Sequence, residues 1–298
     1  GRRYYVNAGL SAQASSRFGE DANGLKLFNT VWGLFPSVEA AWVMSNEQWL
    51  AGVKGVDYLR LNAGFDVTGN DDIDYIASRS YFVSKRMLGE KGATGKMIGN
   101  IGNTELQWET TRRLTAGLES NLFGNRVNVR FNFFKSWTSN LLSLSQLAWT
   151  SGLDQNWGND GKLENTGFDV HLGWKVLAMK DLTWEVGASL GHYKNEVTAL
   201  PNNNGSIETD IYGATIQTKV GQPVGLFYGF KTAGVYTTND AAKADGYYVV
   251  KENGEKAYFQ GGDMRFVDMD GNRCINDNDR TVIGDPNPDI SGTINTTL

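Results

Sequence analysis

The feature that most constrains the fold is a long stretch, residues 126–137, that reads RVNVRFNFFKSW. Its polar members are Arg126, Asn128, Arg130 and Asn132, and they alternate with valine and phenylalanine. Because successive side chains of a β-strand point to opposite faces, the pattern predicts a strand with one polar and one apolar face. In a soluble sheet the apolar face would cover a core. In an outer-membrane barrel it would face lipid, while the polar face lined the lumen.

The same period-two alternation recurs along the whole chain, and helical periodicity is almost absent. Most of the alternating stretches extend over about 10 residues or more, whereas a typical globular strand has about 5–6. The sequence therefore predicts an all-β protein with antiparallel strands. The eight predicted strands are 4–13, 38–44, 59–67, 113–119, 126–137, 168–176, 182–190 and 290–298.

The connections between these strands alternate in length. Short ones are predicted near 51–56, 124–125 and 178–181, and long ones near 18–34, 70–106, 141–164 and 198–287. This rhythm places every short turn at one end of the sheet, as the short periplasmic turns and long extracellular loops of outer-membrane barrels require. Aromatic residues near the strands suit interfacial girdles, although they would also suit a core: Trp42, Trp49, Tyr58, Trp108, Trp137, Trp174 and Trp184.

The loop rhythm favours a transmembrane barrel over a soluble sandwich, so the polar rows are predicted to face a lumen. The predicted lumen-facing residues are Arg126, Asn128, Arg130, Asn132, Asp169, His171, Lys175 and Glu185. Composition narrows the function classes further. The net charge of −5 and the lack of a basic stripe argue against nucleic acid as a partner.

Three segments resemble a known family. VGQPVGLFYGFKTAGVY (220–236) and GDMRFVDMDGNRCINDNDRTVIGDPNPDISG (262–292) are similar to the late-barrel region of SusC/RagA-like TonB-dependent transporters. NDGKLENTGFDVHLGWKV (159–176) resembles the segment that precedes it in that family. The resemblance covers roughly residues 100–298 and is most specific in 220–292.

The resemblance implies that residues 1–298 are part of the barrel domain of such a transporter in the bacterial outer membrane. The predicted strands would then be about eight of a barrel of about 22. Eight strands cannot close such a barrel, and open edges are not viable in lipid, so the chain is expected to be a piece of a larger protein, without the plug domain. A SusD-like surface lipoprotein would act as a lid, and TonB would energise uptake of an oligosaccharide or peptide. The chain would not be an enzyme. The alternative is a secreted all-β carbohydrate-binding or glycan-degrading protein.

The sharpest local motif is DMDGNRCINDND, residues 268–279, which matches a twelve-residue calcium loop. Oxygen ligands at alternate positions can surround a hard cation such as Ca²⁺. Position 6, where such loops carry glycine, is Arg273, and an Asx-rich turn without an ion would explain the same residues. The candidate ligands are Asp268, Asp270, Asn272, the Cys274 carbonyl, Asn276 and Asp279.

Aromatic residues in the predicted long connections are candidate contacts for substrate or lid. Trp149 and Trp157 could stack on sugar rings or pack one loop against another, and Phe227 lies in the GLFYGF segment. Aromatic side chains are favoured anchors at interfaces, so these three residues are predicted ligand or lid contacts.

Overall fold

The computed structural model describes residues 2–28, 30–86, 94–147, 150, 155–201 and 205–298. The chain forms two compact units. Unit 1 comprises Gly1–Gly205 and Pro288–Leu298, and unit 2 comprises Ser206–Asn287. Among the described residues, no helix has the length and apolar character needed to cross a membrane.

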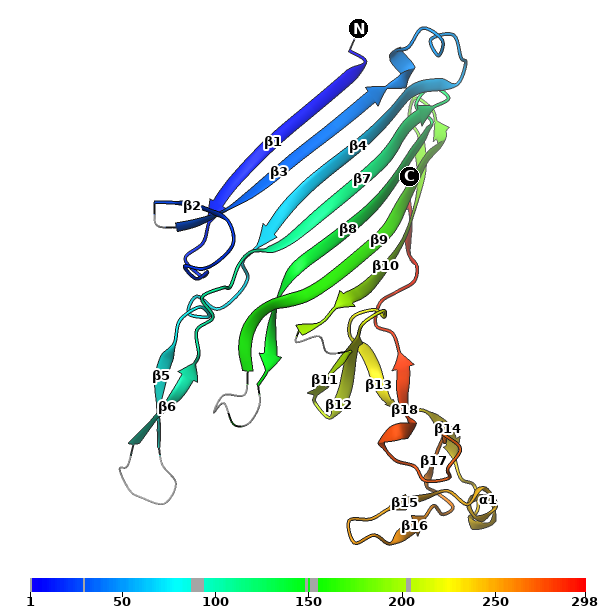
Figure 1. Ribbon diagram of the computed structural model, residues 1–298. Coiled ribbons are helices and arrows are strands. Elements are labelled where there is room, and N and C mark those ends of the chain that lie inside the picture. Colours follow the sequence, from blue (N-terminus) through cyan, green and yellow to red (C-terminus); the bar gives the residue numbers. More distant parts are fainter. Residues whose placement is uncertain (1, 29, 87–93, 148–149, 151–154, 202–204) are drawn as a thin grey trace. The chain divides into compact units, whose positions relative to one another are not determined.

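Unit 1 is dominated by one large antiparallel sheet, in which neighbours in space are also neighbours along the chain (Figure 1). The strand order is β1-β3-β4-β7-β8-β9-β10-β19, and β2 pairs with β3 outside this path. All eight predicted strands are confirmed. Their bounds are β1 (Tyr4–Ala14), β3 (Thr30–Val43), β4 (Val56–Asn70), β7 (Glu109–Leu122), β8 (Val127–Gln146), β9 (Gln155–Ala178), β10 (Thr183–Ala199) and β19 (Ser291–Thr297), with β2 at Leu25–Leu27.

Strands β8 and β9 are much longer than predicted, and the long loop predicted at 141–164 is wrong for most of its length. The two strands stay paired as far as Gln146 and Gln155. The register shifts on both sides of Leu141, and Asn140 has a φ of 56°. Such bulges add residues to one strand and break the period-two pattern while pairing continues. Strand β2 and the start of β3 lie inside the predicted loop 18–34. They were also missed because their residues show no sustained alternation.

The short and long connections of this sheet lie at opposite ends, as predicted (Figure 1). Between β7 and β8, Phe123, Gly124 and Asn125 form a tight turn with φ values of 57°, 69° and 61°. Glycine and asparagine adopt this left-handed conformation most readily. The opposite end carries the hairpin of β5 (Tyr81–Arg86) and β6 (Thr94–Asn100), and unit 2 is inserted there between β10 and β19.

The hydrophobic core of unit 1 lies under its long connections. Ile73, Ala77 and Leu106 form a buried cluster, against which Trp157 packs. Trp108 is also buried, and its ring lies 5.0 Å from Phe18 and 5.3 Å from Phe35 between ring centroids. The prediction of Trp108 as a girdle residue is therefore wrong, because it precedes β7 at the loop end and packs inward.

Unit 2 is built from short elements. A four-stranded sheet has the order β11-β12-β13-β18, and two separate two-stranded sheets pair β14 with β17 and β15 with β16. Their bounds are β11 (Ser206–Ile211), β12 (Ala214–Lys219), β13 (Leu226–Phe230), β14 (Thr232–Val235), β15 (Tyr248–Val250), β16 (Lys256–Tyr258), β17 (Met264–Phe266) and β18 (Arg280–Gly284). Helix α1 (Asn239–Asp245) begins after Thr238, whose side chain accepts a hydrogen bond from the Ala241 N–H, and Gly246 ends it with a φ of 68°.

Candidate functional sites: the two sheet faces and the acidic loop

The strand register sorts the residues of unit 1 onto two chemically opposite faces. Residues opposite one another across the ladder share a face. One such row, which crosses all eight strands, consists of Tyr5, Ala41, Asn62, Gly117, Asn132, Asp169, Gly191 and Ser291. The next row along consists of Tyr4, Trp42, Leu61, Leu118, Phe131, Val170, Leu190 and Gly292. The first row is mostly polar or small, and the second is almost wholly apolar.

The polar face carries a network of cross-strand hydrogen bonds and ion pairs. The Asn132 amide donates to the Asp169 carboxylate at 2.9 Å, and the Asn128 amide donates to Asn121 at 2.6 Å. His171 Nδ1 lies 2.9 Å from the Ser189 hydroxyl. These hydrogen bonds pair the polar side chains with one another across the strands, while the side chains stay on an open surface.

Charged members of this face also pair across strands. The Lys175 ammonium lies 3.4 Å from Glu185, and Arg130 lies 3.5 Å from Glu119. The predicted polar row therefore forms one chemically continuous surface. Arg126 lies one residue before β8, in the turn, but it lines the same 230 Å³ hollow as Asn128, His171, Lys175 and Glu185.

Several charged residues of this face were not predicted from the sequence. Arg60 lies 3.4 Å from Glu39 and 4.0 Å from Glu119, so it bridges two neighbouring strands. Arg113 forms a two-pronged pair with Asp66, at 3.0 and 3.3 Å. The available signal for these ion pairs was that adjacent predicted strands carry opposite charges at alternating positions. Pairing the charges requires the register between the two strands, and alternation within one strand does not define that register.

A close approach of side chains explains one glycine of the polar face. A Cβ on Gly117 would lie 2.4 Å from Asn62 Oδ1 and 2.8 Å from Asn132 Oδ1. A Cβ there would have to displace the amide groups of both neighbouring strands, so glycine lets these side chains approach closely. The polar face is thus packed by its own side chains as well as charged.

The apolar face has no covering layer in the described part of the chain. Val6, Leu172 and Ile294 expose 75%, 45% and 85% of their surface, and Phe131 exposes 40%. Monomeric soluble proteins rarely expose a contiguous apolar surface of this kind. A sandwich would bury this face under a second sheet. The surface is therefore suited to an apolar environment.

Large aromatic residues lie on the apolar face toward the short-turn end. Tyr4 stacks on Trp42 with ring centroids 6.3 Å apart, and Trp174 and Trp184 are exposed by 52% and 36%. Tyr58 is different, since it pairs in register with Asn121 on the polar face and so does not belong to this group.

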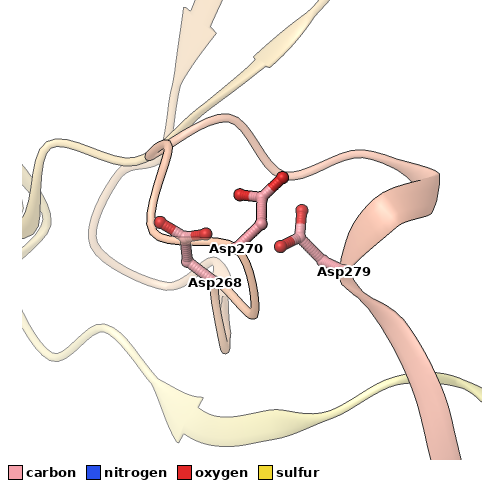
Figure 2. Close-up of side chains that lie close together, drawn as sticks. All are labelled: Asp268, Asp270 and Asp279. Atoms are coloured by element: carbon pink, nitrogen blue, oxygen red, sulfur yellow. The ribbon is translucent and has the colours of Figure 1, made fainter.

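In unit 2, the acidic loop brings three carboxylates together, as Figure 2 shows. One oxygen from each of Asp268, Asp270 and Asp279 lies within 4.8 Å of the others. Asp279 is fully buried, and it accepts hydrogen bonds from the N–H groups of Met269 at 2.8 Å and Asn276 at 2.9 Å. Three negative groups at this spacing repel one another unless a cation or a proton offsets them.

The electrostatics of Asp268 favour its ionised form. Burial raises the pKa of Asp268, but hydrogen bonds from the backbone N–H groups of Arg273 at 2.7 Å and Gly271 at 2.8 Å outweigh it. The pKa of this carboxyl therefore lies below its usual range. An ionised carboxylate is what a hard cation requires as a ligand.

The remaining predicted ligands make local hydrogen bonds. Asn272 accepts from the Cys274 N–H, while the Asn276 amide donates to the Cys274 carbonyl at 3.0 Å. Asn276 also caps the short 3₁₀ turn Asp277–Asp279. Arg273 has a φ of 65°, so position 6 takes the left-handed conformation usually reserved for glycine. The donor set of the three aspartates fits a calcium ion, and the three other residues also fit an Asx-rich turn.

The three aromatic residues predicted as ligand or lid contacts have different positions. Trp149 lies outside the described residues. Trp157 was predicted in a loop, which is wrong, because it lies in β9 and packs on the buried cluster of unit 1. Phe227 lies in β13, opposite Ile216 and Gly284, and exposes 43% of its surface.

Comparison with known proteins identifies the family of this two-faced sheet. Residues 1–255 match the model of the TonB dependent receptor-like, beta-barrel family. The chain belongs to this family. The chain is 29% identical to the TonB-dependent receptor P3 of Formosa agariphila over 91% of its own length and 27% of that protein's. It is 25% identical to the TonB-dependent receptor SusC of Bacteroides thetaiotaomicron over 97% of its own length and 27% of the relative's.

A solved structure shares the fold of this receptor chain. The RagAB peptide transporter superposes with a TM-score of 0.77 at 22% identity, over 98% of this chain and 30% of that one. The chain therefore spans about a quarter of the length of the curated relatives it matches. The resemblance to SusC/RagA-like transporters, inferred from residues 159–176, 220–236 and 262–292, is confirmed, and so is the barrel fold class.

Proposed function

We propose that this chain forms part of the wall of a TonB-dependent importer in the bacterial outer membrane. One observation carries the proposal: an exposed apolar row and a hydrogen-bonded polar row lie back to back across eight strands. A barrel wall between lipid and a wet lumen needs both surfaces, whereas a soluble sandwich needs its apolar row covered. The Val129 and Phe131 side of β8 would then face lipid, and Asn128 and Asn132 would face the lumen.

The loop lengths orient this wall. Long extracellular loops and short periplasmic turns are the rule in bacterial barrels. The turns at 123–126 and 179–182 would accordingly lie at the periplasmic end. Unit 2 is inserted in the connection between β10 and β19, at the opposite, extracellular end of the sheet.

The substrate of the proposed importer is an oligosaccharide or a peptide. The resemblance to SusC/RagA-like transporters implies these two classes, and the RagAB structure with the same fold is a peptide transporter. A wet, charged lumen would suit either class. TonB would supply energy, and a SusD-like surface lipoprotein would close the extracellular end. The chain itself would position and pass a substrate without changing it. Loss of nutrient-dependent growth on deletion of the gene, matched by deletion of TonB, is the expected result.

Thiol labelling tests the two faces directly. In the full-length protein with every native cysteine, including Cys274, replaced by serine, single cysteines are placed at Phe131 and at Asn132, which are neighbours on opposite faces. In whole cells permeable to the reagent, a water-soluble maleimide should label Asn132→Cys and spare Phe131→Cys. After denaturation both should react equally. Equal labelling of the folded protein at the two positions would contradict the lipid-facing assignment.

We also propose that the acidic loop binds Ca²⁺ through Asp268, Asp270 and Asp279. The three converging carboxylates and the low pKa of Asp268 support this. Chelation should raise the protease sensitivity of residues 262–287, and Asp268→Ala with Asp270→Ala should reproduce that change without chelator. Because the pKa of Asp268 is lowered on folding, its stabilising effect should be present above the ordinary aspartate pKa of about 3.9 and lost as pH falls below it.

The lid contact is proposed for Phe227. This side chain is half exposed on a strand of unit 2, whereas Trp157 is committed to packing in unit 1. Phe227→Ala should reduce recovery of the lipoprotein with the purified importer while leaving barrel assembly unchanged. Trp157→Ala should instead destabilise the long connections of unit 1. Full recovery of the lid with Phe227→Ala would show that the contact lies elsewhere.

A further inference from the structure

Among the described strand residues of the apolar face, the basic ones gather at one end of the sheet. They come from four neighbouring strands, and we refer to them as the basic belt. The basic belt consists of Arg112 on β7, Lys135 on β8, Lys162 on β9 and Lys194 on β10. All four lie toward the long connections.

The register places the members of the belt close to one another on this face. Lys135 and Lys194 both lie opposite Thr166, one on each side of it. Arg112 lies opposite Trp137, two residues along β8 from Lys135. The Lys135 ammonium lies 5.1 Å from the centre of the Trp137 ring, so its orientation on the apolar face follows from a contact as well as from parity.

The belt directly borders the apolar surface. Lys135 lies opposite Leu114, and two residues earlier on the same face Phe133 lies opposite Phe168. At the other end, the same face of these strands carries Leu122, Val127, Trp174 and Trp184. No strand residue of that face at that end is basic in the described ranges. Among the described strand residues, the two ends of the apolar face therefore differ in charge.

The belt carries an excess of positive charge. Within it, Lys135 lies 3.3 Å from Glu164 and Lys194 lies 3.1 Å from Glu196. Neither pair is buried, and such exposed pairs contribute little and can exchange partners. For Arg112 and Lys162, the described residues offer no ion pair. Two of the four cations of the belt are therefore available to further anionic groups.

We propose that the basic belt binds the phosphate groups of a phosphorylated glycolipid in the outer leaflet of the outer membrane. This inference rests on the proposed outer-membrane orientation, in which the belt lies at the extracellular rim of the lipid-facing surface. Basic residues at a membrane boundary recognise anionic head groups, and guanidinium and ammonium groups hydrogen-bond phosphate oxygens strongly. The acyl chains would lie on Leu114 and Phe133, with Trp137 at the interface between them and the head group.

Lipid binding to the purified full-length protein tests the proposal. The belt variant carries Arg112, Lys135, Lys162 and Lys194 replaced by glutamine. Its control carries glutamine at four other exposed lysines, Lys54, Lys180, Lys219 and Lys251, so both lose four charges. Native mass spectrometry then counts retained diphosphorylated lipid A, lipid A with its phosphates removed, and phosphatidylglycerol.

The belt variant should retain diphosphorylated lipid A about 10-fold less than the wild type and the control, since several phosphate contacts are lost. Removal of the phosphates from lipid A should weaken its binding to the wild type by the same factor of about 10. Undiminished retention by the belt variant would overturn the proposal, as would equal retention of phosphatidylglycerol by the wild type. The thiol labelling at Phe131 and Asn132 distinguishes a failure of the belt proposal from a failure of the proposed barrel wall. Correct labelling with unchanged lipid A binding contradicts only the belt, whereas equal labelling contradicts the barrel wall on which it rests.

Discussion

The large sheet of unit 1 and the small sheets of unit 2 both pair their backbone N–H and C=O groups, but they differ in strand length and in how the strands are connected. In unit 1, strands of up to 24 residues pair over their whole length, and their side chains are sorted by face. In unit 2, strands of three to six residues are joined by turns whose polar side chains bond the nearby backbone. Long alternating strands leave an apolar surface open, whereas short strands enclose a local core.

The aromatic contacts of unit 2 show what replaces the open apolar face of unit 1. The rings of Phe259 and Phe266 pack 5.9 Å apart, and Phe230 lies 5.6 Å from Phe266. The Arg280 guanidinium lies 5.5 Å from the Tyr228 ring and donates to the Thr215 hydroxyl at 2.8 Å. These rings are half-buried, and the buried hydrophobic side chains of unit 2 are Leu226, Tyr236, Ala242 and Ile275. Unit 2 therefore packs small local clusters, whereas the large sheet of unit 1 separates a polar from an apolar face.

The largest expected effect is on the apolar face of unit 1. Phe131→Arg should destabilise the folded protein in membranes by about 2–4 kcal/mol if the residue lies near the bilayer midplane. Asn128→Arg, on the polar face of the same strand, should be tolerated, because the proposed lumen is wet. Denaturant titration of the full-length protein folded into phospholipid vesicles measures both.

The matched substitution in unit 2 is Tyr212→Arg, because Tyr212 is fully exposed at the β11–β12 turn. It should leave stability unchanged within about 0.5 kcal/mol, as surface substitutions usually do. Equal destabilisation by Phe131→Arg and Tyr212→Arg would remove the distinction between the two units.

A smaller effect is expected inside unit 2. Asp279→Asn should cost about 1–3 kcal/mol, because an amide nitrogen would replace one of two buried oxygens that accept backbone hydrogen bonds. Asp277→Asn is the control, since Asp277 is exposed in the same turn. Protease sensitivity of unit 2 should increase for Asp279→Asn alone. A similar change in the accessibility of Phe131 and Asn132 would show that the two units are not separate in stability.

The contrast also explains how far the sequence predicts the structure. Period-two alternation was sufficient for all eight long strands and for the two faces, since alternation is how a strand separates two environments. It failed where bulges around Leu141 extend β8 and β9, and for the β5–β6 hairpin and unit 2, whose strands are too short for a period to show.

The candidate sites differ in how many of their residues the sequence alone could predict. The three aspartates of the acidic loop could be found from spacing, because that chemistry is local in sequence. The roles of Asn272 and Asn276 could not, since a short polar side chain can bond either an ion or the adjacent backbone. The basic belt and the Arg60 pairs depend on register between strands, which is set by the assembled sheet.

The smallest expected effect concerns the polar face of unit 1. Asp66→Asn removes the charge that pairs with Arg113, yet the Arg113 side chain is about half exposed, so water can replace the lost contact. We expect a loss of about 0–1 kcal/mol, which should decrease further at high salt because exposed pairs are screened. Denaturant titration at low and high ionic strength measures it. A loss as large as that of Phe131→Arg, unaffected by salt, would mean that this face is dry, and the assignment of lumen and lipid sides would have to be reversed.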